Sequence, residues 1–190
     1  MSKFIKIVGI DPALANFGLA EVTLNVENLN FHVDKLILPQ SESEAGKVVR
    51  KNSDDLRRAQ ILYRGMIQSC KGAAFAIAEI PVGSQSARAM ASYGVCVGVL
   101  AACPISLIQV TASEVKRAAT GYKNATKAEM IDWAMEKYPY ANWVMRKSKG
   151  VMVPQACNEH LADALAAIEA GILTDQFIQA IALYKGLKAA

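Results

Sequence analysis

Two acidic residues each end an apolar stretch, where a buried carboxylate could take part in metal-dependent chemistry. Asp11 ends the β-branched run 5–11, and Glu79 ends the apolar run 74–79. A carboxylate at the end of a buried strand loses much of its hydration, so it needs a compensating partner. Divalent cations such as Mg²⁺ prefer oxygen ligands and would supply that partner. Converging acids of this kind predict the site of a metal-dependent nuclease.

A third acidic residue lies in an Ala- and Leu-rich segment with helical periodicity. His160 and Asp163 are three residues apart, so they share one face of a helix. Glu159 precedes them, and its charge would interact favourably with the dipole at the start of that helix. We therefore expect His160 and Asp163 to complete the metal site if this helix crosses the ends of the two strands.

The apolar periodicity of the chain predicts the elements that would position these residues. Strands are predicted from β-branched and alternating runs at residues 3–11, 18–25, 31–38, 74–79 and 105–110. Helices are predicted at residues 54–70, 87–103, 112–119, 127–138 and 159–170, followed by a last amphipathic helix. The segments 39–52 and 146–158 are predicted to be loops. The predicted helix caps are Thr111 with Glu114, Thr126 with Glu129, Asn158 and Thr174, and Gly171 is predicted to end the helix 159–170.

Three consecutive strands followed by alternating helices and strands predict a mixed α/β sheet. If the strands that end at Asp11 and Glu79 are parallel neighbours, both acids lie at the carboxyl edge of the sheet, where open α/β sheets bind their ligands. The length of 190 residues and the absence of a linker or repeat predict a single domain over residues 1–190.

Composition narrows the class of protein. A 53% apolar content argues against disorder, and the longest apolar stretch, residues 95–110, is too short and too polar to cross a membrane. No signal peptide is recognisable, so we expect a cytoplasmic protein without a membrane partner. The four cysteines form no CxxC pair and are predicted to be reduced thiols in an intracellular chain. The sequence does not reveal whether the host is a bacterium, a virus or an organelle.

The net charge of +4 is unevenly distributed along the chain. Segment 46–72 has seven basic residues against two acidic ones, and segment 116–149 has eight against three, so each carries +5. The remainder carries −6 and includes all the candidate metal ligands. Basic flanks around an acidic centre suit a polyanion that is bound at its edges with metal at the middle, although ordinary solvated helix faces would give the same pattern.

Several segments of the chain, taken in order, resemble the motifs of RuvC-type Holliday-junction resolvases. Residues 9–20 are similar to the family's first motif, in which a Gly-Ile-Asp-Pro-Gly-like turn leads into a second strand. Glu79 resembles the second acidic motif at the end of strand four. Residues 160–166 resemble the last motif, where two ligands three residues apart are followed by Ala-Leu. The resemblance covers about residues 5 to 171.

This resemblance implies an RNase H-like mixed five-stranded sheet flanked by helices. It further implies a homodimer that resolves four-way (Holliday) or branched DNA junctions in recombination and repair, by symmetric nicking that depends on Mg²⁺ or Mn²⁺. Two ions would be bound per site. Asp11 would bridge both ions, Glu79 would bind one, and Asp163 with His160 would bind the other. His160 occupies a position where many members have Asp and some have His, and His is an acceptable ligand for Mn²⁺.

The resemblance also implies residues that contact nucleic acid. Lys116 and Lys127 are similar to the family's basic positions near the scissile phosphate and would stabilise the transition state. We further expect Lys123, Ser86 and Arg88 to contact the DNA. The family often has an aromatic residue just after the second acid, but residues 80–84 here read Ile-Pro-Val-Gly-Ser, so sequence-selective cleavage of the family's kind is not predicted.

Three other functions fit parts of the sequence. An actin-like ATP-binding phosphotransferase would need a second lobe and a Gly-rich phosphate loop, and the chain has neither the length nor such a loop. A non-catalytic junction-binding protein on the same fold would be expected to lack one of the acids, and none is missing. A related nuclease that acts on RNA or on replication forks would share every ligand, so only a panel of substrates separates it from a junction resolvase.

Overall fold

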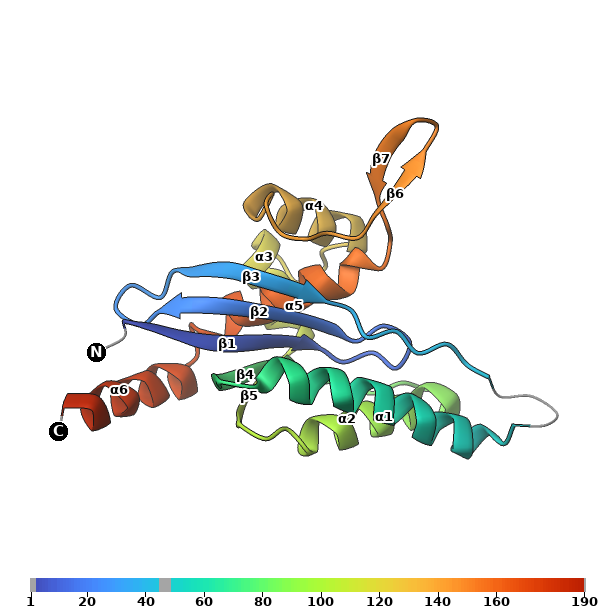
Figure 1. The fold of residues 1–190 in the computed structure, drawn as a ribbon, viewed down its shortest axis with the longest axis horizontal. Helices are drawn as coiled ribbons and strands as arrows, with labels where there is room; N and C mark the ends of the chain where they lie inside the picture. Colours follow the sequence, from blue (N-terminus) through green and yellow to red (C-terminus); the bar gives the residue numbers. More distant parts are fainter. Residues whose placement is uncertain (1–2, 45–48, 190) are drawn as a thin grey trace.

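A computed structural model describes residues 3–44 and 49–189, and within them the fold is built on a five-stranded sheet (Figure 1). The strand order is β3-β2-β1-β4-β5. β1, β2 and β3 form an antiparallel meander, whereas β4 runs parallel to β1, and β5 runs parallel to β4. The predicted mixed sheet is therefore confirmed, with strands at Phe4–Asp11 (β1), Gly18–Asn25 (β2), Phe31–Ile37 (β3), Ala73–Glu79 (β4) and Ser106–Val110 (β5).

Helices cover both faces of the sheet (Figure 1). On one face lie α1 (Lys51–Cys70) and α2 (Ala87–Ala101), and on the other lies α5 (Asn158–Gly171), with α3 (Ala112–Thr120) and α4 (Lys127–Lys137) packed beside it. The last helix, α6 (Asp175–Ala189), follows α5 after a short turn. α1 begins three residues before its predicted start, and residues 45–48, which belong to the predicted loop 39–52 and partly to the basic segment 46–72, lie outside the described residues.

Alternation along β1 divides the core into two parts. Ile5 and Ile7 belong to the cluster that includes α5, whereas Val8 and Ile10 belong to the cluster that includes α1 and α2. All four side chains are almost fully buried because the strand has helices on both faces. The continuous apolar run of the first strand is thus explained by its central place in the sheet.

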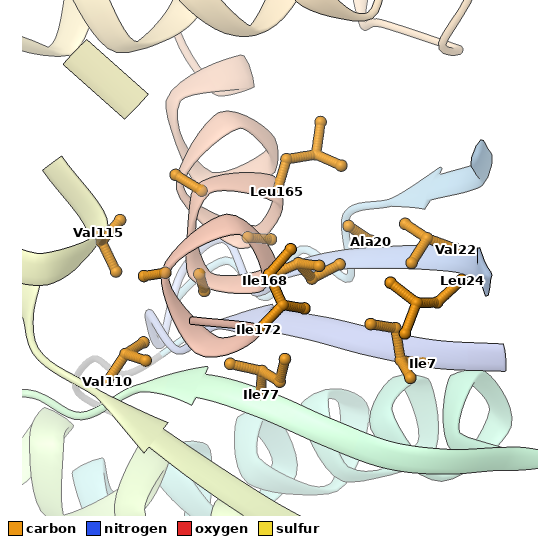
Figure 2. Packing of buried hydrophobic residues seen from close by; sticks show 14 of the residues in the cluster. Ile7, Ala20, Val22, Leu24, Ile77, Val110, Val115, Leu165, Ile168 and Ile172 are labelled. Carbon is orange, nitrogen blue, oxygen red and sulfur yellow. The ribbon is translucent and has the colours of Figure 1, made fainter. Parts of the chain in front are cut away.

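α5 is the central helix of one face, and its side chains are buried nearly all round. Figure 2 shows Leu165 and Ile168 of α5 among Ile7 and Val22 of the sheet. Between them the helix has mostly alanines, which keep its backbone close to β1 and β2 and to the neighbouring helices. Because α5 packs against the sheet and the neighbouring helices, the residues of its first turns lie over the carboxyl end of β1.

Most of the predicted helix starts are confirmed. Thr111 with Glu114 and Thr126 with Glu129 form the two predicted capping boxes at α3 and α4. The Thr174 hydroxyl accepts a hydrogen bond from the Phe177 backbone N–H, as expected for the cap of the last helix. All four cysteines are free; Cys70 and Cys96 are buried, as expected of core thiols, whereas Cys103 and Cys157 are partly exposed.

Two predictions near residue 150 are wrong. The segment 146–158 is not all loop, because Met145–Ser148 (β6) and Val151–Pro154 (β7) form an antiparallel hairpin. Asn158 does not cap α5; its side chain instead hydrogen-bonds both backbone groups of Val144. The two β-strands pair with each other, and the Asn158 amide pairs with the backbone of Val144, fourteen residues away and directly before β6, so this contact anchors the start of the hairpin.

Across the described ranges, no single helix is both long and apolar enough to span a membrane. α5 and the part of α6 up to Gly186 reach that length and composition only when taken together, and a bend of 69° separates them.

Candidate active site

The carboxyl ends of β1 and β4 bring Asp11 and Glu79 together. The parallel register pairs Ile10 with Ala78, so the acid that follows each of them lies at the same edge of the sheet. Period-two alternation then directs both acids to the face covered by α5, the face on which Ile7 and Ile77 are buried. The predicted parallel arrangement of these two strands is confirmed.

The first turns of α5 bring His160 and Asp163 to the same place. His160 Nδ1 lies 2.6 Å from Asp11 Oδ2, and the two side chains are only 16% and 13% exposed. Asp163 lies one turn further along the helix, and its Oδ1 atom is buried without a hydrogen-bond partner. Thus all four residues predicted as metal ligands converge, although they come from three different elements.

Two glycines allow α5 to approach this closely. A Cβ atom on Gly18 would lie 2.0 Å from the backbone oxygen of His160, and one on Gly9 would lie 2.1 Å from that of Ala164. No side-chain rotation could relieve either clash, because the obstructing atoms belong to the backbone of α5. The lack of side chains at Gly9 and Gly18 therefore determines how near the helix lies to Asp11.

Burial and mutual repulsion perturb the acids of the site. Burial, followed by the charge of Asp11, raises the pKa of Glu79 to about 7, and the charge of Lys116 partly opposes this rise. Burial, with the charges of Asp11 and Glu79, raises the pKa of Asp163 to about 8. Burial lowers the pKa of His160, but the hydrogen bond and charge of Asp11, with the charges of Glu159 and Asp163, outweigh it and leave that pKa raised.

These shifts describe a site with excess negative charge. Three carboxyl groups share a poorly hydrated space, and one buried carboxylate oxygen has no donor. Such an arrangement is stabilised by a cation, so the donor set fits a hard divalent metal ion. Among the described residues, no three His, Cys, Asp or Glu side chains already have a geometry that would bind a metal ion, and His160 is hydrogen-bonded to Asp11 instead.

The two predicted catalytic lysines both lie close to the acidic cluster. Lys116, on α3, lies near enough to Glu79 to lower its pKa. Lys127, at the start of α4, forms an ion pair at 2.9 Å with Glu159 of α5. Glu159 also lies 3.4 Å from His160 Nε2, so it connects Lys127 to the site. Sequence reasoning placed Glu159 at the helix dipole but did not predict its contact with Lys127, since nothing in the local sequence indicates that α4 packs beside α5.

The other predicted nucleic-acid contacts lie outside this cluster. Lys123 is exposed in the loop between α3 and α4. Ser86 caps α2 by accepting a hydrogen bond from the Ala89 backbone N–H. Arg88 forms a two-point ion pair with Asp55 of α1, with N–O distances of 2.5 and 2.6 Å. This pair ties α2 to α1, and a role of Arg88 in contacting DNA stays a prediction.

Comparisons with known proteins identify the fold. No protein-family model and no curated protein matches the sequence. Among solved structures, the chain is similar to T. thermophilus RuvC in complex with a Holliday junction substrate, with 15% sequence identity, a TM-score of 0.64, and coverage of 94% of this chain and 96% of that one. It is also similar to a second Thermus thermophilus RuvC structure, with 16% identity, a TM-score of 0.60, and coverage of 87% and 92%. The predicted RNase H-like fold and its resemblance to RuvC are therefore confirmed at the level of the fold.

Proposed function

From the fold it shares with RuvC, we propose that this protein is a divalent-metal-dependent endonuclease that nicks four-way or branched DNA. The observation that supports this most strongly is the convergence of Asp11, Glu79, His160 and Asp163 at one edge of the sheet, with a buried Asp163 oxygen that has no protein partner. Mg²⁺ or Mn²⁺, with two ions per site, would satisfy these oxygens. The first of the two similar RuvC structures contains a Holliday junction substrate, which supports branched DNA as the proposed substrate.

In this proposal the four side chains would hold the metal ions, and the bound ions would supply an activated water molecule and stabilisation of charge on the leaving oxygen. Asp11 would help to hold both ions, because its Oδ2 atom contacts His160 and its charge contributes to the raised pKa of Glu79. Glu79 would serve one ion, and Asp163 with His160 would serve the second. Binding requires the protons of Glu79 and Asp163 to leave, because carboxylates bind metal in the ionised form.

The two lysines would act on the phosphate. Lys116 lies beside the acidic cluster and would bind a non-bridging phosphate oxygen as negative charge develops in the transition state. The side chain of Lys127 is 81% exposed, and its ammonium group forms an ion pair with Glu159. It can therefore reach an incoming phosphate while it stays next to the site. Both lysines also screen the repulsion between the acids and the DNA backbone.

We further propose that the single nuclease domain acts as a homodimer. A four-way junction has near-two-fold symmetry, so two active sites related by a C2 axis would cut opposed strands. The apolar groove between α1 and α2, with a volume of about 570 Å³, is the candidate contact face. It exposes Leu56 and Tyr63 of α1 beside the small residues Ala91 and Gly98 of α2.

Cleavage of a panel of labelled DNAs tests this function. The panel contains a four-way junction, a replication fork, a linear duplex and an RNA–DNA hybrid, each incubated with Mg²⁺ and with a chelator. We expect paired nicks in the junction that depend on Mg²⁺, with little cutting of the duplex. Preferred cutting of the fork or the hybrid would favour the related nuclease activity instead, and no cutting of any substrate would contradict the proposal.

A further inference from the structure

The β6–β7 hairpin is the most prominent projection of the molecule. It extends away from the sheet, beyond α4 and α5 (Figure 1). Its two-residue turn, Lys149-Gly150, has positive φ at both positions (49° and 87°), as in the tight turns that join twisted strands. A two-stranded hairpin in water is only marginally stable by itself. Its presence here therefore requires an anchor at its base.

A buried asparagine provides that anchor. Asn158 is fully buried, and its side chain accepts a hydrogen bond from the Val144 N–H and donates one to the Val144 carbonyl, both at 2.9 Å. The Gln155 backbone N–H donates to the same carbonyl at 3.0 Å. Asn158 lies two residues before His160 on α5. The hairpin is thus fixed to the helix that carries half of the candidate active site.

The charge of the hairpin is entirely positive. No acidic residue occurs between Tyr138 and Asn158, whereas Arg146, Lys147 and Lys149 all lie on the hairpin and are exposed. None of these three forms an ion pair with any residue that the structure describes, in contrast to Arg57 and Arg88, which are paired. Unpaired cations on a projection that is anchored at its base are suited to bind an anionic partner from solution.

The hairpin also exposes two apolar side chains beside its turn. Val151 is 64% exposed and Met152 is 57% exposed, and they follow Gly150 directly. The strand register pairs Val151 with Ser148 and Met152 with Lys147, so each apolar group lies beside a polar or basic one. Phosphates would satisfy the cations but not these two side chains, which are consecutive in β7 and therefore offer apolar contacts on both faces of the hairpin.

We propose that the β6–β7 hairpin is a DNA-binding arm that recognises the branch point. Arg146, Lys147 and Lys149 bind phosphates, and Val151 and Met152 pack against the faces of unstacked bases. Bases at a branch are more readily unstacked than those in a continuous duplex, and apolar side chains inserted at such steps are a known mode of DNA binding. This inference rests on the proposed function, because it takes branched DNA as the ligand.

Two variants and two matched controls test the arm. In the first pair, Arg146→Gln/Lys147→Gln/Lys149→Gln is compared with Lys3→Gln/Lys35→Gln/Lys185→Gln, which removes the same charge from exposed lysines outside both basic segments. In the second pair, Val151→Ser/Met152→Ser is compared with Leu173→Ser/Leu183→Ser, whose leucines are 70% and 69% exposed. Thermal unfolding of all four checks that each is folded, as expected for exposed positions.

Binding of a labelled four-way junction and a linear duplex is measured in a chelator over a range of salt concentrations. The basic variant should reduce the slope of log affinity against log salt by about two to three, and its control should change it much less. The apolar variant should keep the slope but lose on the order of tenfold in its preference for junction over duplex. A 2-aminopurine base at the branch point should become brighter with wild-type protein and with both controls, but not with the apolar variant.

The outcomes separate this inference from the proposed function. If the wild-type protein binds and cuts the junction while both hairpin variants behave like their controls, the arm is excluded and the nuclease stands. If the wild-type protein binds the junction without cutting it, yet the hairpin variants bind as predicted, the arm stands and the nuclease fails. Equal loss of binding to junction and duplex in the apolar variant would overturn branch recognition.

Discussion

His160 Nδ1 lies 2.6 Å from Asp11 Oδ2, although the two residues are 149 positions apart in the sequence. This contact joins the end of the central strand to the first turn of α5. A histidine with this neighbour remains largely protonated to a higher pH than usual, because its positive form is stabilised by the adjacent carboxylate. In the absence of metal, His160 therefore supplies part of the positive charge that the acidic cluster requires.

Substitution of His160 tests whether it also binds metal. We expect His160→Asp to retain nicking in Mg²⁺, because a carboxylate is a hard oxygen donor, and His160→Ala to lose it by about tenfold or more. Nicking rates of a four-way junction at several Mg²⁺ concentrations provide the measurement, with His32→Ala as a control on an exposed histidine of β3. Full activity in all variants would make His160 a structural residue only.

The raised pKa of Asp163 predicts a pH-dependent stability. The folded chain keeps a proton on Asp163 up to a pH of about 8, whereas the unfolded chain releases it near the ordinary value of 3.8. Between these values the folded state binds more protons, so the free energy of unfolding of the metal-free protein should fall as pH rises. In Asp163→Asn, this pH-dependent decrease in the free energy of unfolding should be smaller by a few kcal/mol.

Urea unfolding at pH 5 and pH 8 in a chelator provides the comparison. Addition of Mg²⁺ at pH 8 should restore stability to the wild-type protein but much less to Asp163→Asn, because the ion replaces the lost protons. The prediction fails if the two proteins show the same change in unfolding free energy between the two pH values.

Gly18 offers a test of how closely α5 must lie to the sheet. A methyl group at this position would meet the backbone oxygen of His160, so Gly18→Ala should destabilise the fold by about 1–3 kcal/mol and displace His160 from Asp11. Gly186→Ala is the matched control, since no atom lies within 4 Å of a Cβ there and alanine is the better helix former. Unfolding free energies and nicking rates should fall together for Gly18→Ala alone.

The proposed dimer predicts a mass of about twice the 20.4 kDa chain. Sedimentation at micromolar concentration measures it. Leu56→Glu should give monomers, because a charge would be buried in the apolar groove between α1 and α2. Leu183→Glu on α6 controls for a charge on an exposed leucine elsewhere. A wild-type protein that stays monomeric with junction DNA but nicks both strands in one binding event would contradict the dimer.

The sequence predicted the sheet, and which four side chains would lie together at its edge, because both depend on local patterns. β-branched runs that end in an acid identify Asp11 and Glu79, and the helical spacing of His160 and Asp163 identifies their shared face. These patterns suffice because a buried strand and a buried helix each have a strong periodic signal. The expectation that Asp11 and Glu79 lie together then needed only one assumption about topology, that the first and fourth strands are parallel neighbours.

The parts that sequence reasoning missed depend on contacts between distant segments. The β6 and β7 strands have four residues each, and their turn is Lys-Gly, a weaker signal than Asn-Gly. Asn158 has the residue type and position of a helix cap, but it pairs with the backbone of Val144 instead. Likewise, the pairing of Lys127 with Glu159 is set by the packing of α4 on α5, which no local pattern describes.

The central claim is that Asp11 and Glu79 serve catalysis rather than DNA binding or folding. Single-turnover nicking of a labelled four-way junction in Mg²⁺, measured beside binding of the same junction in a chelator, tests it most directly. Asp11→Asn and Glu79→Gln should each abolish nicking, by about a thousandfold or more, yet bind the junction at least as tightly as wild type, since binding depends mainly on basic contacts to phosphates. Asp132→Asn and Glu136→Gln, at exposed acids of α4, should nick normally. Nicking by Asp11→Asn or Glu79→Gln at near the wild-type rate would contradict the account.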